Sequence, residues 1–237
     1  MTARREQKSE RKRVEILRSA AWVFRQKGYF SATMEDISER LLMTKGSLYY
    51  YFKCKEEIFY HCQEYVLDRL LQGLQEAKTT EHDPAGRLGR LVKHHIAVIT
   101  DDLTGSVLHL DFDLLSPPYL VPIIRKRDQY EKGIRRLIQD GVEQGTFRRC
   151  DVKLTAFALL GALNWVSKWH SPEGGLKAET IAHFYEDYLV GGLLAAGRVA
   201  QSSSRVLRSV TAAPTKAADQ KKPIYQESNL AEESWLL

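Results

Sequence analysis

Residues 29–52 read YFSATMEDISERLLMTKGSLYYYF, and this stretch decides how the chain is organised. Thr33 can begin a short helix, because its hydroxyl caps free backbone amides and the carboxylate of Asp36 lies three residues on. Thr44 can begin a second short helix that contains Lys45-Gly46-Ser47-Leu48-Tyr49-Tyr50-Tyr51. Two short helices joined by a tight turn predict a helix-turn-helix.

A longer helix is predicted just before this stretch. Four apolar residues follow the i, i+3, i+7, i+10 spacing of one buried helix face: Val14, Leu17, Ala21 and Phe24. Ser9 can cap the start of this helix, and Gly28 can end it after Lys27 because glycine readily adopts positive φ. Residues 9–52 are therefore predicted to form three short helices.

Positive charge is concentrated at the amino-terminal end. Residues 1–56 hold 13 Lys and Arg against 7 Asp and Glu, whereas residues 57–237 hold 22 against 23. A basic end on a near-neutral body is typical of a protein that binds a polyanion such as nucleic acid. A solvated basic tail without a partner gives the same pattern, and charge alone does not separate the two.

The remainder of the chain is predicted to be helical, so the fold class is all-α. A fourth helix is expected from about Cys54 to Lys78, and five more near residues 84–102, 106–115, 119–145, 151–170 and 176–197. Proline- and glycine-rich breakers separate them, and alternating strand patterns are absent. Residues 200–237 are low in apolar content and lack periodicity, so we expect a disordered tail there.

Composition and motifs exclude several classes of protein. No apolar run approaches the ~20 residues that cross a bilayer, and no secretory signal is visible, so we expect a cytoplasmic protein without a membrane partner. Three cysteines do not make a disulfide framework. The chain has no P-loop, G-x-S-x-G, G-x-G-x-x-G or H-E-x-x-H motif, and no closely spaced Cys/His set. We therefore expect no enzyme, catalytic residue, cofactor or metal site.

Residues 9–60 resemble the DNA-binding region of the TetR family of repressors. The first helix, the Thr-led second helix, the Lys-Gly-Ser-Leu-Tyr core and the aromatic residues before Phe52 occur in the family's order. The resemblance implies a basic arm at 1–8, a helix-turn-helix DNA-binding domain at 9–55, and a helical effector-binding and dimerisation domain at 56–199. Its expected partner is an operator in double-stranded DNA.

The resemblance and the size of the DNA major groove together indicate the contact residues. The groove is ~12 Å wide, so the first turn of a recognition helix should be slim, as Thr44, Lys45, Gly46 and Ser47 are. Leu48 and Phe52 should face inward. We expect base or groove contacts from Lys45, Ser47 and Tyr49, and phosphate contacts from Thr33, Tyr50 and Lys55. The alternative for the tyrosines is plain packing.

Two residues depart from the family pattern. Leu42 stands in the turn where glycine is usual, so a positive φ there would cost about 1 kcal/mol or more unless the turn is reshaped. Cys54 stands where a Ser, Asn or Asp usually caps the fourth helix. A thiol is a weak acceptor, so this cap should be poorer, and redox activity of Cys54 is a less favoured hypothesis.

The resemblance implies that the last two helices, residues 151–170 and 176–197, form the interface of a homodimer. A two-fold dimer can bind a palindromic operator, whereas one helix-turn-helix contacts only a few base pairs. The resulting interpretation is a ligand-responsive regulator, favoured as a repressor, that a small-molecule effector releases from DNA. A helical interaction adaptor with a basic end is the alternative from another class.

Residues 161–175 resemble TetR regulators of lipid and sterol catabolism that respond to acyl-CoA thioesters. Trp165 and Trp169 could stack on adenine, and Lys168 could bind a phosphate. The acyl part would enter an apolar tunnel, for which Phe112, Leu115 and Tyr119 are the candidate lining. Two alternatives stay open: the tryptophans pack the dimer interface, or the effector is an apolar or drug-like molecule without CoA.

Overall fold

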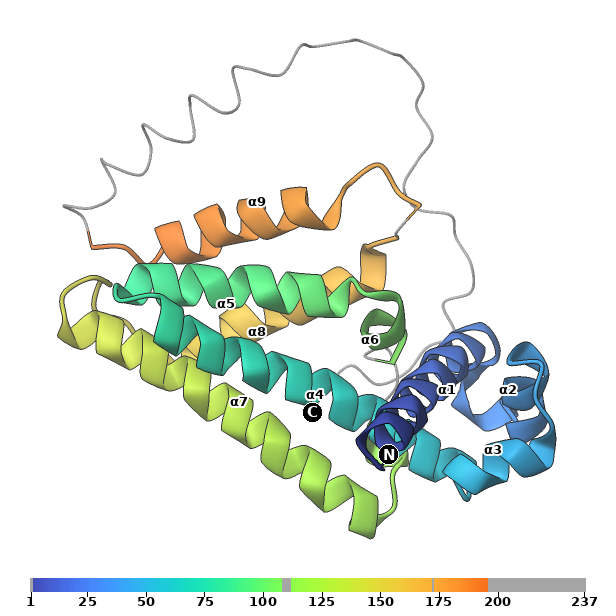
Figure 1. Cartoon of the computed structure of the whole chain (residues 1–237). Coiled ribbons are helices and arrows are strands. Elements are labelled where there is room, and N and C mark those ends of the chain that lie inside the picture. Colours follow the sequence, from blue (N-terminus) through green and yellow to red (C-terminus); the bar gives the residue numbers. More distant parts are fainter. Residues whose placement is uncertain (1, 108–111, 172, 196–237) are drawn as a thin grey trace, which may run out of the picture. The chain divides into compact units, whose positions relative to one another are not determined.

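Helices form nearly all of the regular structure in the computed structural model, which describes residues 2–107, 112–171 and 173–195 (Figure 1). In that part of the chain the only strand-like pairing is one isolated bridge between Phe147 and Leu194. The all-α prediction is therefore confirmed. The helices are α1 Thr2–Ser31, α2 Met34–Arg40, α3 Lys45–Tyr51, α4 Lys55–Thr80, α5 Pro84–Ile99, α6 Asp102–Val107, the 3₁₀ turn η1 Phe112–Leu114, α7 Pro117–Glu143, α8 Val152–Trp169 and α9 Ala178–Gly191.

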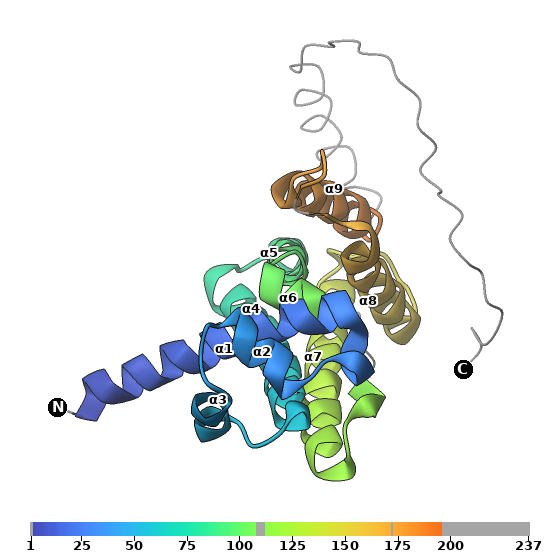
Figure 2. The ribbon, with the colours of Figure 1, turned by 90° about the vertical axis from the view of Figure 1, so that its right-hand side faces the viewer.

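The predicted start of the first helix is wrong. α1 begins at Thr2, so residues 2–8 are its first two turns and Ser9 lies inside it rather than capping it. No Pro or Gly interrupts residues 2–8, and Arg, Glu, Gln and Lys are good helix formers. Figure 2 shows these turns projecting past α2 and α3. The predicted break at Gly28 is confirmed, with φ 74° and ψ 159°, and one more turn follows it.

The starts of α2 and α3 are the ones predicted from their threonines. The Thr33 hydroxyl accepts a hydrogen bond from the Asp36 amide at 3.1 Å, and the Thr33 amide donates to the Asp36 carboxylate at 2.9 Å. The Thr44 hydroxyl accepts from the Ser47 amide at 3.2 Å. Leu42, in the turn between them, has φ 51°, so the backbone keeps the glycine-like conformation without a glycine.

The fourth helix confirms the expected weak cap. Cys54 is its N-cap, and the Cys54 sulfur accepts from the Glu57 amide at 3.4 Å. α4 packs against α1 through an aromatic cluster in which the Phe24 and Phe59 rings lie 5.9 Å apart, edge to face. Edge-to-face pairs stabilise such contacts beyond the area that they bury. The helix-turn-helix is thereby attached to the long helix that leads into the rest of the protein.

The second group of helices surrounds an apolar core. α5 packs between α4 and α9, and α7 packs against both α4 and α8 (Figure 1). The largest core side chains of α5, among them Leu88, Leu91 and Ile96, are completely buried. Burial on this scale contributes roughly 1.5–3 kcal/mol for each large aliphatic side chain. This helical group is the framework that positions the second candidate site.

One predicted helix is wrong, and three expectations concern residues outside the described ranges. Instead of a helix over 106–115, α6 ends at Val107 and a 3₁₀ turn begins at Phe112, because the apolar spacing in this segment is too short to fix a helix boundary. Residues 108–111 within that segment, the end of the 176–197 helix and the tail 200–237 lie outside the described part.

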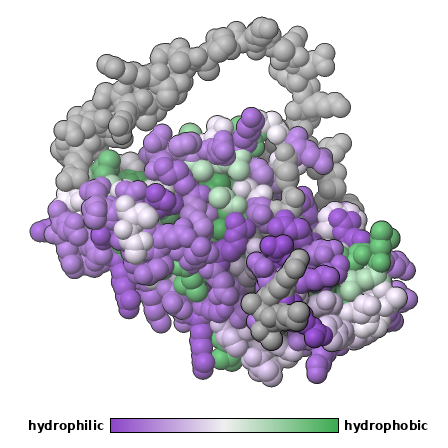
Figure 3. Space-filling view, viewed as in Figure 1, coloured by the Kyte–Doolittle hydropathy of each residue, from purple (hydrophilic) through white to green (hydrophobic). Residues whose placement is uncertain are grey.

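Hydrophilic residues cover most of the described surface in the view of Figure 3, with hydrophobic residues in separate patches. Among the described residues, no helix combines the length and apolarity that crossing a bilayer requires. The exposed large apolar side chains fall mainly on the α2–α3 region and on α8 and α9. These regions are where partners of the protein should be sought.

Replacing Leu42 with glycine should stabilise the protein. A left-handed residue other than glycine costs about 1–2 kcal/mol, whereas glycine costs roughly 0.5–1 kcal/mol of backbone entropy. The Leu42 side chain is 96% exposed, so little packing is lost. We expect Leu42→Gly to raise the free energy of unfolding by about 0.5–1 kcal/mol in urea denaturation. Leu42→Val should lower it, and an unchanged value for Leu42→Gly would contradict the strain at this turn.

Candidate nucleic-acid interface and effector cavity

The recognition helix α3 has one buried and one exposed face, as predicted. Leu48 and Phe52 are completely buried. Tyr49 and Tyr50 are 44% and 78% exposed. Four further predicted contact residues are exposed as well: Thr44, Lys45, Gly46 and Ser47. Tyr51 is half-buried, so the three consecutive tyrosines do not share one environment.

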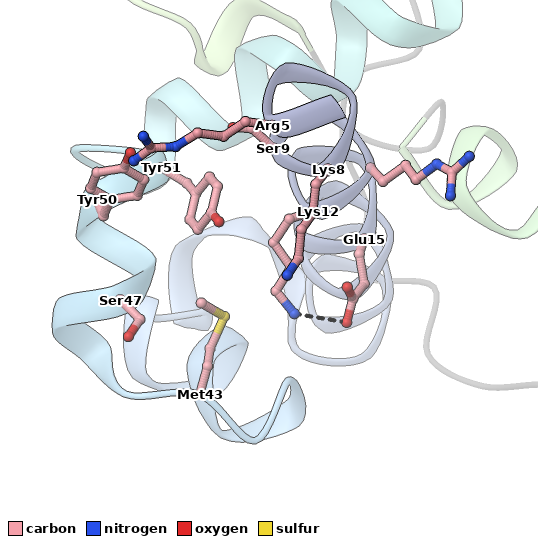
Figure 4. Close-up of a pocket in the computed structure, with 10 residues that line it drawn as sticks. Arg5, Lys8, Ser9, Lys12, Glu15, Met43, Ser47, Tyr50 and Tyr51 are labelled. Carbon is pink, nitrogen blue, oxygen red and sulfur yellow. Dashed lines mark hydrogen bonds and ion pairs between the residues drawn. The ribbon is translucent and has the colours of Figure 1, made fainter. Parts of the chain in front are cut away.

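A groove of about 920 Å³ separates α3 from the amino-terminal turns of α1 (Figure 4). We call it the α1–α3 groove. It is lined by Arg5, Lys8, Ser9, Arg11, Lys12, Glu15, Met43, Ser47, Tyr50 and Tyr51. Lys12 pairs with Glu15 at 3.0 Å, the one acidic side chain in the lining. The groove is therefore basic along α1 and aromatic along α3, a combination suited to a phosphate backbone.

The groove depends on α1 being helical to its start, which the sequence patterns did not reveal. The geometry is fixed by Arg13, whose guanidinium donates to the Tyr51 carbonyl at 3.1 Å and lies 4.4 Å from the Phe52 ring centre. Cation–π contacts of this kind hold a long side chain in one place. Arg13 thus fixes the end of α3 to α1, and the two walls of the groove move as one piece.

The predicted phosphate-contact residues Thr33 and Lys55 already have partners within the chain. The Thr33 hydroxyl and amide both bind Asp36, whose pKa falls to about 2 because Lys27 and Thr33 hydrogen-bond to it. The Lys55 ammonium donates to three carbonyls, of Tyr29 at 2.7 Å, Phe30 at 3.1 Å and Ala32 at 2.9 Å. Burial lowers the pKa of Lys55.

Lys55 therefore closes the end of α1 rather than standing free for a phosphate. The turn after Gly28 leaves carbonyl groups without helical partners, and an ammonium supplies three donors. The sequence contained no signal for this role, because residues 29–32 and Lys55 are brought together only by the packing of α1 on α4. Lys45 is different: its ion pair with Glu35, at 3.6 Å, is exposed at both ends and therefore weak.

Gly46 has open space around it. A Cβ atom at this position would meet nothing within 4 Å, and the backbone is helical. Glycine in a helix costs about 1 kcal/mol relative to alanine. No contact within the described chain therefore requires glycine here, and the position is free for close approach of an external partner.

The six predicted effector residues fall into two separate groups. Phe112 lies under the Arg127 guanidinium at 4.0 Å, Leu115 is buried, and the Tyr119 ring packs 5.1 Å from that of Tyr60. These three lie where η1 leads into α7. Trp165, Lys168 and Trp169 lie exposed on α8. None of the six lines the cavity described next.

A cavity of about 240 Å³ lies between α4, α5, α7 and α8, and we call it the α7–α8 cavity. It is lined by Leu67, Leu70, His95, Arg127, Asp128, Tyr130, Glu131, Leu160 and Asn164. His95 is completely buried, and burial lowers its pKa to about 4. The sequence patterns missed these residues because they come from four helices and share no motif. Within the described ranges no cluster of His, Cys, Asp or Glu could hold a metal ion.

A helix-turn-helix with a basic groove, joined to a helical domain with an internal cavity, defines the class of bacterial DNA-binding regulators. Residues 16–62 match the family described as "Bacterial regulatory proteins, tetR family", and residues 81–193 match "Tetracyclin repressor-like, C-terminal domain". The chain therefore belongs to the TetR family of transcriptional regulators. The resemblance seen in the sequence is confirmed.

Individual relatives agree with this assignment. The TetR-family regulator PfmR of Thermus thermophilus is 34% identical with a TM-score of 0.69, over 76% of this chain and 99% of that one. The transcriptional repressor KstR2 of Mycolicibacterium smegmatis is 29% identical, over 77% of this chain and 90% of the relative. The structure of AibR in complex with isovaleryl coenzyme A and operator DNA is 26% identical with a TM-score of 0.66, over 77% and 97%.

Proposed function

We propose that this TetR-family regulator represses transcription by binding a palindromic operator as a homodimer, and that a small-molecule effector releases it. The observation that carries the proposal is the exposed α3 face beside the basic α1–α3 groove. DNA-binding proteins combine side chains that reach base edges with cations that bind phosphates. Here α3 supplies the first set and the amino-terminal turns of α1 supply the second.

The proposed roles follow the exposure of each side chain. Lys45, Ser47 and Tyr49 contact base edges, and Gly46 allows the backbone of α3 to approach the groove floor. Thr44 and Tyr50 contact phosphates, together with the backbone at the Thr33 end of α2. Lys55 acts through the position of α1 and α4 instead of through a direct contact, because its three donors bind carbonyls.

The proposed dimer contact is the outer surface of α8 and α9, which we call the α8–α9 face. Its exposed apolar residues recur at helical spacing and are Leu154, Phe157, Trp165, Phe184 and Tyr188. Phe184 and Tyr188 stack with ring centres 6.1 Å apart. Apolar side chains gathered on one surface indicate a protein contact, and a two-fold contact would present two α3 helices to successive turns of DNA.

The proposed effector is an acyl-CoA thioester. The support is the resemblance of residues 161–175 to acyl-CoA-responsive regulators, and the exposure of Trp165 and Trp169 with Lys168 between them. A relative of similar fold was solved with isovaleryl coenzyme A. Exposed tryptophans at the α8–α9 face can contact both the partner subunit and a nucleotide. Phe112, Leu115 and Tyr119 stay the predicted acyl lining, and a non-CoA apolar effector is the alternative.

Release requires a difference in effector affinity between two arrangements of the dimer. An effector that binds more tightly to the arrangement with misplaced α3 helices draws the population away from the DNA-binding one. α1 packs against α6 as well as α4, so a shift of α6 or α4 in the effector domain reaches the α1–α3 groove directly.

Gly46→Ala should change stability and DNA affinity in opposite directions. The added methyl group meets no atom of the chain and removes the helix cost of glycine, so the free energy of unfolding should rise by about 0.5–1 kcal/mol. The same methyl group should lower operator affinity about tenfold or more in fluorescence anisotropy if α3 approaches DNA closely. Gly175→Ala, also in open space, is the control that should leave affinity unchanged. Unchanged affinity for Gly46→Ala would remove Gly46 from the interface.

Phe184→Glu should convert the dimer to a monomer. A buried, unpaired carboxylate on each side of a two-fold contact is strongly unfavourable. Sedimentation at micromolar concentration should show the wild type as a dimer and the variant as a monomer with greatly reduced operator affinity. Phe30→Glu, at a phenylalanine 80% exposed and outside the α8–α9 face, should remain dimeric. A dimeric Phe184→Glu protein would place the interface elsewhere.

A band shift on the DNA upstream of the protein's own gene should show specific binding that one of a panel of acyl-CoA thioesters releases. The salt concentration is fixed at ~150 mM, because phosphate contacts make affinity fall steeply with salt. Trp165→Ala should weaken the response to the thioester. Release by an uncharged apolar compound and by no thioester would favour the alternative effector and return Trp165 and Trp169 to dimer packing.

A further inference from the structure

A chain of hydrogen bonds crosses the wall of the α7–α8 cavity. His95 Nε2 lies 3.2 Å from the Asn164 side-chain oxygen, and His95 Nδ1 lies 3.0 Å from the Tyr130 hydroxyl. An amide oxygen only accepts, so Nε2 carries the proton and Nδ1 accepts from the Tyr130 hydroxyl. The buried ring, whose pKa burial lowers, is neutral and completely satisfied. His95 therefore holds Asn164 in one orientation.

This arrangement leaves hydrogen-bond donors facing the cavity. With its oxygen bound to His95, Asn164 has two amide N–H groups for which the described residues show no acceptor. Arg127 adds a guanidinium that lies over the Phe112 ring and, in the described part of the chain, has no carboxylate within 4.0 Å. The two acidic lining residues have cations of their own, since Asp128 pairs with Lys132 and Glu131 with Arg135. The lining thus has a surplus of donors.

The other lining residues set the size and polarity of a guest. Leu67 and Leu70 from α4 and Leu160 from α8 form an apolar wall. The volume, about 240 Å³, is below the ~300–1,000 Å³ of sites that enclose a whole drug-sized ligand. The cavity therefore suits one end of a molecule: a compact apolar group that carries an acceptor oxygen.

We propose that the α7–α8 cavity binds the acyl end of the effector, with Asn164 and Arg127 donating hydrogen bonds to its carbonyl or carboxylate oxygen. His95 and Tyr130 are positioning residues that orient Asn164. This inference rests on the proposed effector response and specifies its chemistry. It moves the acyl site away from the Phe112, Leu115 and Tyr119 lining that the sequence predicts.

The position of Asn164 gives the cavity a path to the proposed dimer contact. Asn164 precedes Trp165 on α8 and lies one turn before Lys168, so a molecule held at its acyl end emerges beside both residues. The helix that detects the oxygen is also the helix that carries the apolar α8–α9 face. A bound acyl group therefore acts directly on an element of the proposed interface.

The test is calorimetric titration of the full chain with probes that share one shape. The probes are cyclohexyl methyl ketone, cyclohexanecarboxylate, its N-acetylcysteamine thioester and methylcyclohexane. In the wild type, at least one oxygen-bearing probe should bind about tenfold more tightly than the hydrocarbon, because a hydrogen bond in a dry site has that effect. Preference for the carboxylate, lost in Arg127→Met, would identify a free acid, and preference for the thioester would identify an activated acyl group.

Variants separate recognition of the oxygen from packing. Asn164→Leu should lower affinity for the preferred oxygen-bearing probe about tenfold and change that for methylcyclohexane less than twofold. Tyr130→Phe should lower the same affinity about threefold through His95. The controls are Gln144→Leu, an exposed amide outside the cavity, and Tyr65→Phe, a half-buried tyrosine of α4, and neither should change any affinity.

Equal losses for the oxygen-bearing probe and the hydrocarbon in Asn164→Leu would overturn the inference, and so would the absence of binding by every probe at millimolar concentration. The operator band shift is measured on the same preparations. Wild-type protein that binds its operator but fails these titrations would reject the cavity and keep the regulator. Protein that titrates as predicted but binds no operator would reject the proposed regulation and keep the cavity.

Discussion

The ammonium group of Lys55, bound to three carbonyls at the end of α1, is the contact on which the arrangement of the DNA-facing end depends. It joins the turn that follows Gly28 to the first turn of α4 and lies 4.5 Å from the Tyr29 ring centre. Without these donors, the carbonyls of that turn would be partly buried and unsatisfied, which is costly. With them, α1 and α4 hold a fixed angle, and α2 and α3 are suspended between them.

From this joint the structure extends in two directions. Toward DNA, Arg13 fixes the end of α3 to α1, so the helical basic turns and the recognition helix form the two walls of one groove. Toward the effector domain, α4 continues into the helical core and supplies Leu67 and Leu70 to the α7–α8 cavity. One helix thus carries both the support for the recognition helix and part of the cavity wall, which gives ligand and DNA a mechanical connection.

Local chemistry explains which elements could be predicted. Thr33, Thr44 and Gly28 determine helix ends through bonds and dihedral angles within a few residues, and these boundaries are confirmed. Leu42 was recognised as a misfit from its position in the turn, and it does adopt positive φ. The start of α1 was wrong because a capping residue signals a possible helix start, whereas the continuing run of helix formers before Ser9 determined the actual one.

The sequence by itself determined the all-α class, the helix-turn-helix, the inward faces of Leu48 and Phe52 and the family, because each is encoded by neighbouring residues or by a short motif. The tertiary structure alone decided the role of Lys55, the helical groove wall and the alignment of His95, Tyr130 and Asn164. Those features join residues 23 to 69 positions apart. Contacts over such separations arise from how whole helices pack, and no local pattern in one sequence specifies them.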